Sequence, residues 1–232
     1  MTRVAVFSQF YHKGSEHFIE VILETLFTQN IQVCMIRELW DLLETHHISI
    51  AHADRLEIID TPDENLDFFI SVGGDGTMLK AVTYVRDLNI PVVGINTGRL
   101  GFLSTIPKEA IADQLTQLIS GAYRTSERTL IQVSTQGLSN ADQSWNYALN
   151  EVSINRKDST SMIRVDVWVD EEHLNTYWSD GLIVATPTGS TGYSLSCGGP
   201  LVHPESANLL ITPIAPHNLN ARPLIIPDDR TV

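Results

Sequence analysis

Several features that would assign the chain to a common class of protein are missing from its sequence. Only 2 of the 232 residues are cysteines, and Cys34 and Cys197 are too far apart for a CxxC pair and too few for a disulfide framework. No apolar run approaches the roughly 18 residues of a membrane-spanning helix, and the N-terminus carries no charged region followed by a long apolar run. We therefore expect a protein of the reducing cytoplasm that is neither exported nor inserted in a membrane.

Basic residues are also few, because 15 Lys and Arg stand against 28 Asp and Glu and leave a net charge of -13. This balance argues against the phosphate-backbone footprint of a nucleic-acid-binding protein and against a polybasic membrane patch. The 8 histidines lack partners at zinc-ligand spacing, so we expect no dedicated metal site. The predicted partners are small molecules or other proteins.

Two common nucleotide-binding loops are missing as well, since the chain has neither the GxGxxG fingerprint nor the Gly-Lys-Ser/Thr of a P-loop. It has instead SVGGDGTMLK at residues 71–80, where an apolar strand gives way to a helix. Its glycines allow positive φ and close backbone approach, which favours an anion-binding loop at a helix N-terminus. The predicted phosphate loop consists of Gly73, Gly74, Gly76 and Thr77. A plain Asp-Gly hairpin turn is the competing interpretation, weakened because residues 77–82 continue as a helix.

Asp75 places a carboxylate in the middle of this predicted anion loop. Bound phosphates would repel it unless it shares a cation with them or takes a proton from a different group. Both roles belong to phosphoryl transfer, in which a carboxylate can receive the proton of the acceptor hydroxyl. The loop therefore predicts phosphoryl-transfer chemistry.

The first half of the chain alternates short apolar runs with helical periodicity. This pattern predicts βαβ units and a parallel sheet. The run from 107 to 120 begins with Pro107 and closes at Gly121, the usual start and stop signals of a helix. The expected strands are 4–7, 31–36, 68–72 and 91–95, and the expected helices are 15–29, 39–43, 77–86 and 107–120.

After about residue 122 the apolar pattern changes to a period of two, without intervening helices, which predicts antiparallel strands. Asp170 to Glu172 read as the turn of a hairpin. We therefore predict an α/β domain with a parallel sheet at 1–122 and a β-rich, β-sandwich-like domain at 123–232. The expected strands of the second domain are 130–133, 147–155, 164–169, 182–185, 209–212 and 224–226.

A second dense segment, residues 179–196, follows a strand with an unusual run of hydroxyls and glycines. Its hydroxyls can donate to phosphate or ribose oxygens, and Tyr193 can stack on a base. A Ser/Thr-rich surface turn is the alternative. Between the clusters, Asn150 and Glu151 interrupt an apolar strand. A buried Glu is rare unless paired, so Glu151 either faces a cleft or lies in water on an edge strand.

Together these segments closely resemble the NAD kinase family. The resemblance rests on GGDGT at 73–77, GINTGRLGFL at 94–103, Asn150-Glu151, Asp180-Gly181 and TPTGSTGY at 186–193. GGDGT alone is shared with lipid kinases of the diacylglycerol and sphingosine type. The resemblance implies transfer of the γ-phosphate of ATP to the 2′-hydroxyl of the adenosine ribose of NAD, giving NADP. It also implies Mg²⁺, or another divalent cation, arriving with ATP, and a homo-oligomer of two or four chains.

Residue roles follow from the same resemblance. Asp75 resembles the base that receives the 2′-hydroxyl proton, and Phe102 is expected near the adenine unless it is an ordinary core aromatic. Lys80, one helical turn past the loop, either reaches a phosphate or is a solvated helix lysine. The predicted NAD-binding residues are Asp75, Gly76, Lys80, Phe102, Asn150, Glu151, Asp180, Thr191, Gly192, Tyr193, Ser194 and Ser196.

Two other functions remain open at this point. A lipid kinase would need attraction to an anionic bilayer, which the net charge of -13 disfavours. A non-catalytic dinucleotide sensor would keep the fold without turnover. The family also continues with further strands after the position of Val232, so we expect the β-rich domain to be incomplete at its C-terminus.

Overall fold

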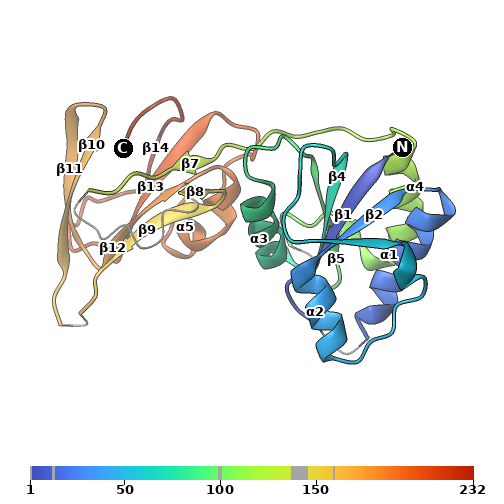
Figure 1. Ribbon diagram of the computed structural model, residues 1–232. Helices are drawn as coiled ribbons and strands as arrows, with labels where there is room; N and C mark the ends of the chain where they lie inside the picture. Colours follow the sequence, from blue (N-terminus) through green and yellow to red (C-terminus); the bar gives the residue numbers. More distant parts are fainter. Residues whose placement is uncertain (1, 12–13, 99–100, 137–145, 159) are drawn as a thin grey trace. The chain divides into compact units, whose positions relative to one another are not determined.

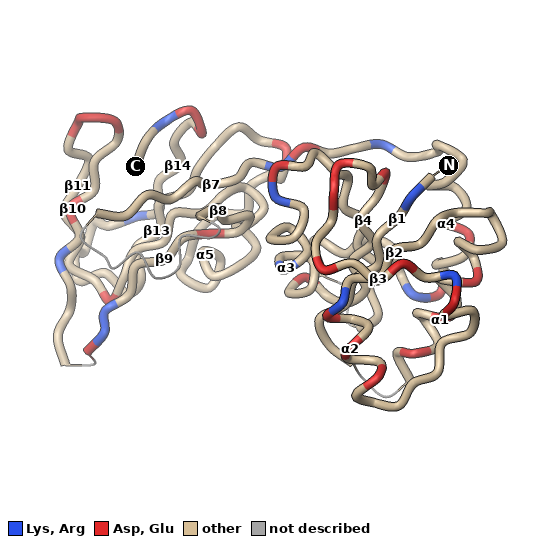
Figure 2. Tube along the Cα trace, in the orientation of Figure 1, with Lys and Arg blue, Asp and Glu red and all other residues tan. Residues whose placement is uncertain are grey.

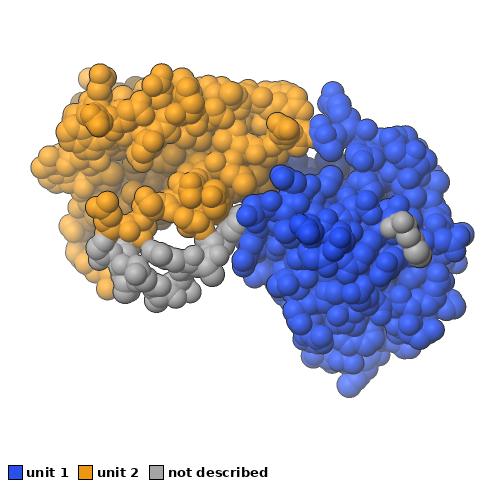
Figure 3. Space-filling model, turned by 45° about the horizontal axis from the view of Figure 1, so that its top comes forward, with its two compact units in different colours: residues 1–125 blue, residues 126–232 orange. Residues whose placement is uncertain are grey.

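The computed structural model describes residues 2–11, 14–98, 101–136, 146–158 and 160–232 (Figure 1). Arg99 and Leu100 of the GINTGRLGFL segment lie outside these described residues. The chain divides into two compact units, residues 1–125 and 126–232 (Figure 3). Acidic residues occur along both units, in keeping with the net charge of -13 (Figure 2). No helix in the described part of the chain is long and apolar enough to cross a membrane.

Unit 1 is an α/β domain whose six strands form one parallel sheet in the order β3-β2-β1-β4-β5-β6. Strands β1, β2 and β3 follow one another toward one edge of the sheet, and strands β4, β5 and β6 follow one another toward the other edge. Ligands of such sheets bind at the carboxyl ends of the strands where the order reverses, and GGDGT follows β4 at this place. The strands are β1 (Arg3–Phe7), β2 (Gln32–Ile36), β3 (Leu56–Ile59), β4 (Phe68–Val72), β5 (Val92–Asn96) and β6 (Ile106–Pro107), and the α-helices are α1 (Glu16–Thr28), α2 (Arg37–Thr45), α3 (Asp75–Val85) and α4 (Ile111–Ile119).

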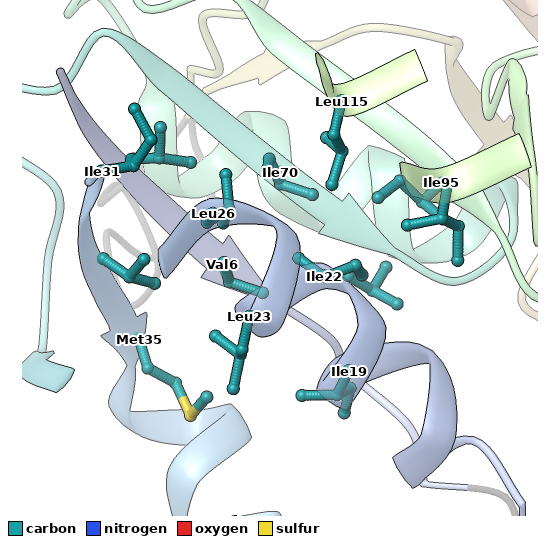
Figure 4. Packing of buried hydrophobic residues seen from close by; sticks show 14 of the residues in the cluster. Val6, Ile19, Ile22, Leu23, Leu26, Ile31, Met35, Ile70, Ile95 and Leu115 are labelled. Carbon is teal, nitrogen blue, oxygen red and sulfur yellow. The ribbon is translucent and has the colours of Figure 1, made fainter. Parts of the chain in front are cut away.

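The core of unit 1 follows from the period of two along its buried strands. Val4 and Val6 face a cluster with α1, α2 and α4, whereas Ala5 and Phe7 face the opposite cluster with α3. Figure 4 shows the first cluster, in which apolar side chains of α1 and of the strands interdigitate. Because side chains on both faces are buried, the strands read as continuous apolar runs, as expected of a parallel sheet.

The predicted parallel α/β architecture is confirmed, with differences at element ends. α3 begins at Asp75, two residues before the expected start, so the carboxylate belongs to the first turn of the helix. Pro107 ends β6 instead of opening a helix, and a 3₁₀ turn at Lys108–Ala110 precedes α4. The short strands β3 and β6 were not predicted.

Unit 2 consists of antiparallel strands, as predicted. β9, β12, β13 and β14 form a sheet in the order β14-β13-β12-β9, while β10–β11 and β7–β8 form two-stranded pairs. The predicted hairpin turn is present at Asp170, with φ of 55°, and β11 begins at Glu172. The elements are β7 (Ile131–Gln132), β8 (Tyr147–Ala148), β9 (Glu151–Asn155), β10 (Ile163–Val169), β11 (Glu172–Ser179), β12 (Gly181–Ala185), the 3₁₀ turn η3 (Thr188–Thr191), the short helix α5 (Tyr193–Ser196), β13 (Asn208–Ile214) and β14 (Leu224–Pro227).

The predicted hairpin implied a second strand after its turn without giving bounds, and β11 is that strand, whereas the two short helical segments were not predicted. Both helical segments lie in the hydroxyl-rich run, for which the sequence predicted no helix, and they connect β12 to the chain leading to β13.

Candidate functional site

The GGDGT loop joins β4 to α3 with a backbone that requires glycine at its first position. Gly73 has φ of +154°, and a Cβ there would lie 2.3 Å from Oγ1 of the buried Thr77. A Cβ at Gly74 or Gly76 would meet no atom of the described residues within 4 Å, so the backbone is open at these two positions in that part of the chain. Among the described residues, no side chain caps the N-terminus of α3. The first N–H groups of α3 can therefore bind an anion.

Asp75 accepts three backbone hydrogen bonds from one loop. Its Oδ2 accepts the N–H of Phe102 at 2.8 Å, and its Oδ1 accepts the N–H groups of Leu103 at 3.0 Å and Ser104 at 3.3 Å. Gly101 lies directly against the carboxylate, since a Cβ at this residue would be 2.2 Å from Oδ1. The structure thus brings together Asp75 and Phe102, both predicted site residues.

Phe102 and Lys80 are exposed side chains of unit 1. Phe102 has 67% of its surface exposed, so it is not an ordinary core aromatic. Nζ of Lys80 lies 5.9 Å from the centroid of the Tyr84 ring, farther along α3. The contact holds the ammonium group by a weak cation–π attraction while leaving it accessible to solvent.

In unit 2, Asn150 and Glu151 lie at the start of β9. Burial raises the pKa of the Glu151 carboxyl, and a hydrogen bond from the backbone N–H of Tyr193 offsets part of this rise. Among the described residues, Asn150 Oδ1 and Glu151 Oε2 are buried acceptor atoms without a hydrogen-bond partner. Unpaired buried acceptors are costly, and functional sites are one place where they occur.

The segment that follows β12 packs tightly against this pair. A Cβ at Gly189 would lie 2.0 Å from the backbone oxygen of Asn150, and one at Gly192 would lie 2.9 Å from Oε2 of Glu151. The N–H of Thr186 donates to the same Asn150 oxygen at 2.8 Å. We call Asn150, Glu151, Gly189 and Gly192 the acceptor cradle, because glycine is what lets the turn lie so close to the backbone of Asn150 and to the carboxylate of Glu151.

The remaining predicted residues of 191–196 differ in how accessible they are. Tyr193 is 41% exposed and Ser196 is exposed, whereas the hydroxyl of Thr191 donates to the backbone oxygen of Thr188 at 3.2 Å. Ser194 is completely buried, and its Oγ lies 2.9 Å from Oγ1 of Thr212 in β13. The Ser194 hydroxyl thus ties α5 to the sheet.

Asp180 lies apart from the acceptor cradle. It precedes β12, whose first residue Gly181 pairs with Asn155, whereas Glu151 pairs with Ala185 at the other end of the strand. At 3.3 Å per residue the two ends are roughly 13 Å apart. The carboxylate of Asp180 forms an ion pair with Arg156 at 3.1 Å.

Sequence reasoning missed three contributors to these sites. Thr188 is buried and its Oγ1 lacks a partner among the described residues, and Gly101 makes room for the Asp75 carboxylate. Thr188 belongs to the TPTGSTGY motif and Gly101 to the GINTGRLGFL motif, so their place beside the assigned residues was the available signal. Arg156 had no local signal, because its partner Asp180 is 24 residues away in sequence.

The described residues contain no group of three or more His, Cys, Asp or Glu side chains placed to hold a metal ion.

Comparison with known proteins identifies the family. The family model of the ATP-NAD kinase N-terminal domain matches residues 4–123, and that of the C-terminal domain matches residues 149–232. The chain belongs to the NAD kinase family. The NAD kinase of Christiangramia forsetii is 45% identical to it over 230 residues, which cover 99% of this chain and 78% of that protein.

Two solved NAD kinase family structures share the fold. The alignment with the structure of yeast NADH kinase in complex with NADH covers 98% of this chain and 70% of the yeast chain, with 27% identity and a TM-score of 0.82. The alignment with the structure of an Archaeoglobus fulgidus NAD kinase in complex with ATP covers 99% of this chain and 78% of the archaeal chain, with 29% identity and a TM-score of 0.74. The chain is an ATP-dependent NAD kinase, and these comparisons lend no support to a lipid kinase or a non-catalytic sensor.

Proposed function

We propose that this NAD kinase transfers the γ-phosphate of ATP to the 2′-hydroxyl of the adenosine ribose of NAD, with Asp75 receiving the hydroxyl proton. The observation that carries the proposal is the position of Asp75 in the first turn of α3, whose N-terminus is capped by no side chain of the described residues and lies beside open glycine positions. An anion-binding helix start and a proton acceptor are thereby neighbours in the chain.

In unit 1, the N–H groups at the start of α3 would bind phosphate oxygens, with Gly74 and Gly76 leaving the backbone accessible. The proton transfer to Asp75 contributes on the order of 100- to 10,000-fold to the rate. In a loose phosphoryl-transfer transition state, positioning and charge neutralisation contribute most of the remainder. Lys80, exposed on α3, supplies one positive charge for this purpose.

In unit 2, the acceptor cradle suits a ribose diol. A diol offers two O–H donors, and Asn150 Oδ1 with Glu151 Oε2 offers two buried acceptors without partners in the described chain. Each hydrogen bond formed there would remove the cost of an unpaired acceptor. The exposed ring of Tyr193 is available to stack on a base, and Thr191 and Ser196 lie on the same segment.

Asp180 and Ser194 have different parts in this proposal. Asp180 lies at the far end of β12 from the cradle, so it would contact a different part of the dinucleotide. Ser194 would act through its hydrogen bond to Thr212, which fixes α5 next to the cradle. Phe102, exposed on the loop that Asp75 holds, would contact the adenine.

The cation, the assembly and the compartment belong to the proposal as well. Mg²⁺ would arrive with ATP and would help to neutralise the charge of its phosphates. The family resemblance supports a cytoplasmic homo-oligomer of two or four chains.

Deoxy analogues test the position of phosphorylation. The purified chain is incubated with ATP, magnesium and NAD analogues that lack either the 2′- or the 3′-hydroxyl of the adenosine ribose, and products are detected by mass spectrometry. We expect a phosphorylated product from the 3′-deoxy analogue and none from the 2′-deoxy analogue. The reverse pattern would contradict the proposed acceptor hydroxyl.

A further inference from the structure

The hydrogen bonds of Asp75 use its two carboxylate oxygens unequally. Each oxygen has about two acceptor directions. Oδ1 accepts from Leu103 and Ser104 and is fully used, whereas among the described residues Oδ2 accepts only from Phe102, which leaves one of its directions free. A hydroxyl can thus approach Oδ2 while all three backbone bonds remain in place.

The loop held by these bonds is fixed from a second side as well. Ser104 is buried against Gly94 in β5, because a Cβ at Gly94 would lie 2.7 Å from the Cα of Ser104. Between Asp75 and β5 the backbone of residues 101–104 has little freedom to move. Its side chain at Phe102 is nevertheless 67% exposed, so a fixed backbone presents a free aromatic ring.

Gly101 makes the arrangement possible. A Cβ at this position would lie 2.2 Å from Oδ1, 2.5 Å from Cγ and 2.6 Å from Oδ2 of Asp75. These atoms form the end of one flexible side chain, so an added methyl group would displace the carboxylate and leave the backbone of α3 where it is.

We propose that Asp75 positions Phe102 in addition to its role as proton acceptor: Oδ1 holds the 101–104 loop, Oδ2 receives the ribose hydroxyl, and Gly101 is the positioning residue that permits both. This inference rests on the proposed function in one respect, the contact of Phe102 with NAD. The hold of Asp75 on the loop does not depend on that function.

Gly101→Ala tests the proposal without removing the carboxylate. The matched control is Gly98→Ala, which adds the same methyl group in the connection between β5 and β6, where no atom of the described residues lies within 4 Å. Amide hydrogen exchange of the ligand-free protein is measured by NMR at residues 102–104. Hydrogen bonds to charged groups predict at least about tenfold faster exchange in Gly101→Ala and unchanged exchange in Gly98→Ala. Unchanged exchange in both variants would overturn the proposal.

A double-mutant cycle with Phe102→Leu tests the link to NAD. Gly101→Ala should raise the KM for NAD in the wild-type background and have a much smaller effect on KM once Phe102 is replaced, because both changes act on one contact. Additive effects on KM would overturn the positioning role. Hydrogen exchange is measured without substrate, so it tests the contact between Asp75 and the loop independently of the proposed function. The proposed function itself would be contradicted if the unaltered chain formed no NADP.

Discussion

Gly189→Ala is expected to damage the acceptor cradle more than a methyl group added at Gly192, the other glycine of the cradle. Its Cβ would lie 2.0 Å from O, 2.5 Å from C and 2.8 Å from Cα of Asn150, all of them backbone atoms that no rotamer change can move away. Favourable contacts between heavy atoms begin at about 3.5 Å, so the turn and the start of β9 would have to separate by roughly 1.5 Å. That separation would strain the hydrogen bond from Thr186 N–H to the Asn150 oxygen, now 2.8 Å long.

The cost of such overpacking is typically about 1–3 kcal/mol. At roughly 2–4 °C per kcal/mol for a chain of this size, the melting temperature should fall by about 2–12 °C. NAD affinity should also fall, on the order of 10- to 100-fold, because a displacement near 1 Å in a binding site has effects of that size. Thermal unfolding by circular dichroism and calorimetric titration with NAD measure both, with Gly98→Ala as the control expected to change neither. A Gly189→Ala protein that matches this control in both measurements would refute the packing argument.

Two further predictions concern charged groups. Because burial raises the pKa of Glu151, its carboxyl favours folding below the ordinary pKa of a glutamate and loses that contribution as pH rises through the raised value. Glu151→Gln should therefore raise the melting temperature at neutral pH, and the difference in stability from wild type should disappear near pH 4. The same substitution should weaken NAD binding. A variant less stable than wild type at neutral pH would contradict the burial argument. Arg3→Ala should lower the free energy of unfolding by about 1–2 kcal/mol in urea titrations, because the largely buried guanidinium bonds Asp63 at 2.9 Å and Glu57 at 3.0 Å and both partners are partly solvated. A change within experimental error would mean that solvent replaces these bonds.

The parallel and antiparallel halves could be read from the sequence because each leaves a periodic trace. The strand Val4–Phe7 is buried on both faces and reads as a continuous apolar run, whereas Arg164–Val169 alternates because only one of its faces is covered. Short elements leave no such trace. β6 has only two residues, and its place beside β5 is decided by tertiary packing.

Some features of the candidate site could likewise be predicted from the sequence, and others could not. Glycines with a positive φ or a close neighbour are visible as sequence motifs, and Gly73 and Gly189 both belong to quoted motifs. The partners of Asp75 were not visible, because three backbone N–H groups of a loop more than 25 residues away carry no residue-type signal. The same holds for Arg156, whose ion pair with Asp180 depends on the pairing of β9 with β12.

The most direct test of the central claim is the rate of NADP formation by the purified chain with NAD, ATP and magnesium, coupled to a dehydrogenase specific for NADP. Asp75→Asn should lower kcat by about 100- to 10,000-fold, because an amide cannot receive the hydroxyl proton. NAD binding should be weakened but still measurable, because the amide oxygen can replace Oδ1 as acceptor for Leu103 and Ser104, whereas the NH2 group cannot accept the N–H of Phe102. Asp113→Asn, which removes an exposed acidic group from the first turn of α4, is the matched control and should keep the wild-type rate. An Asp75→Asn variant that forms NADP as fast as this control would contradict the assignment of Asp75 as the proton acceptor.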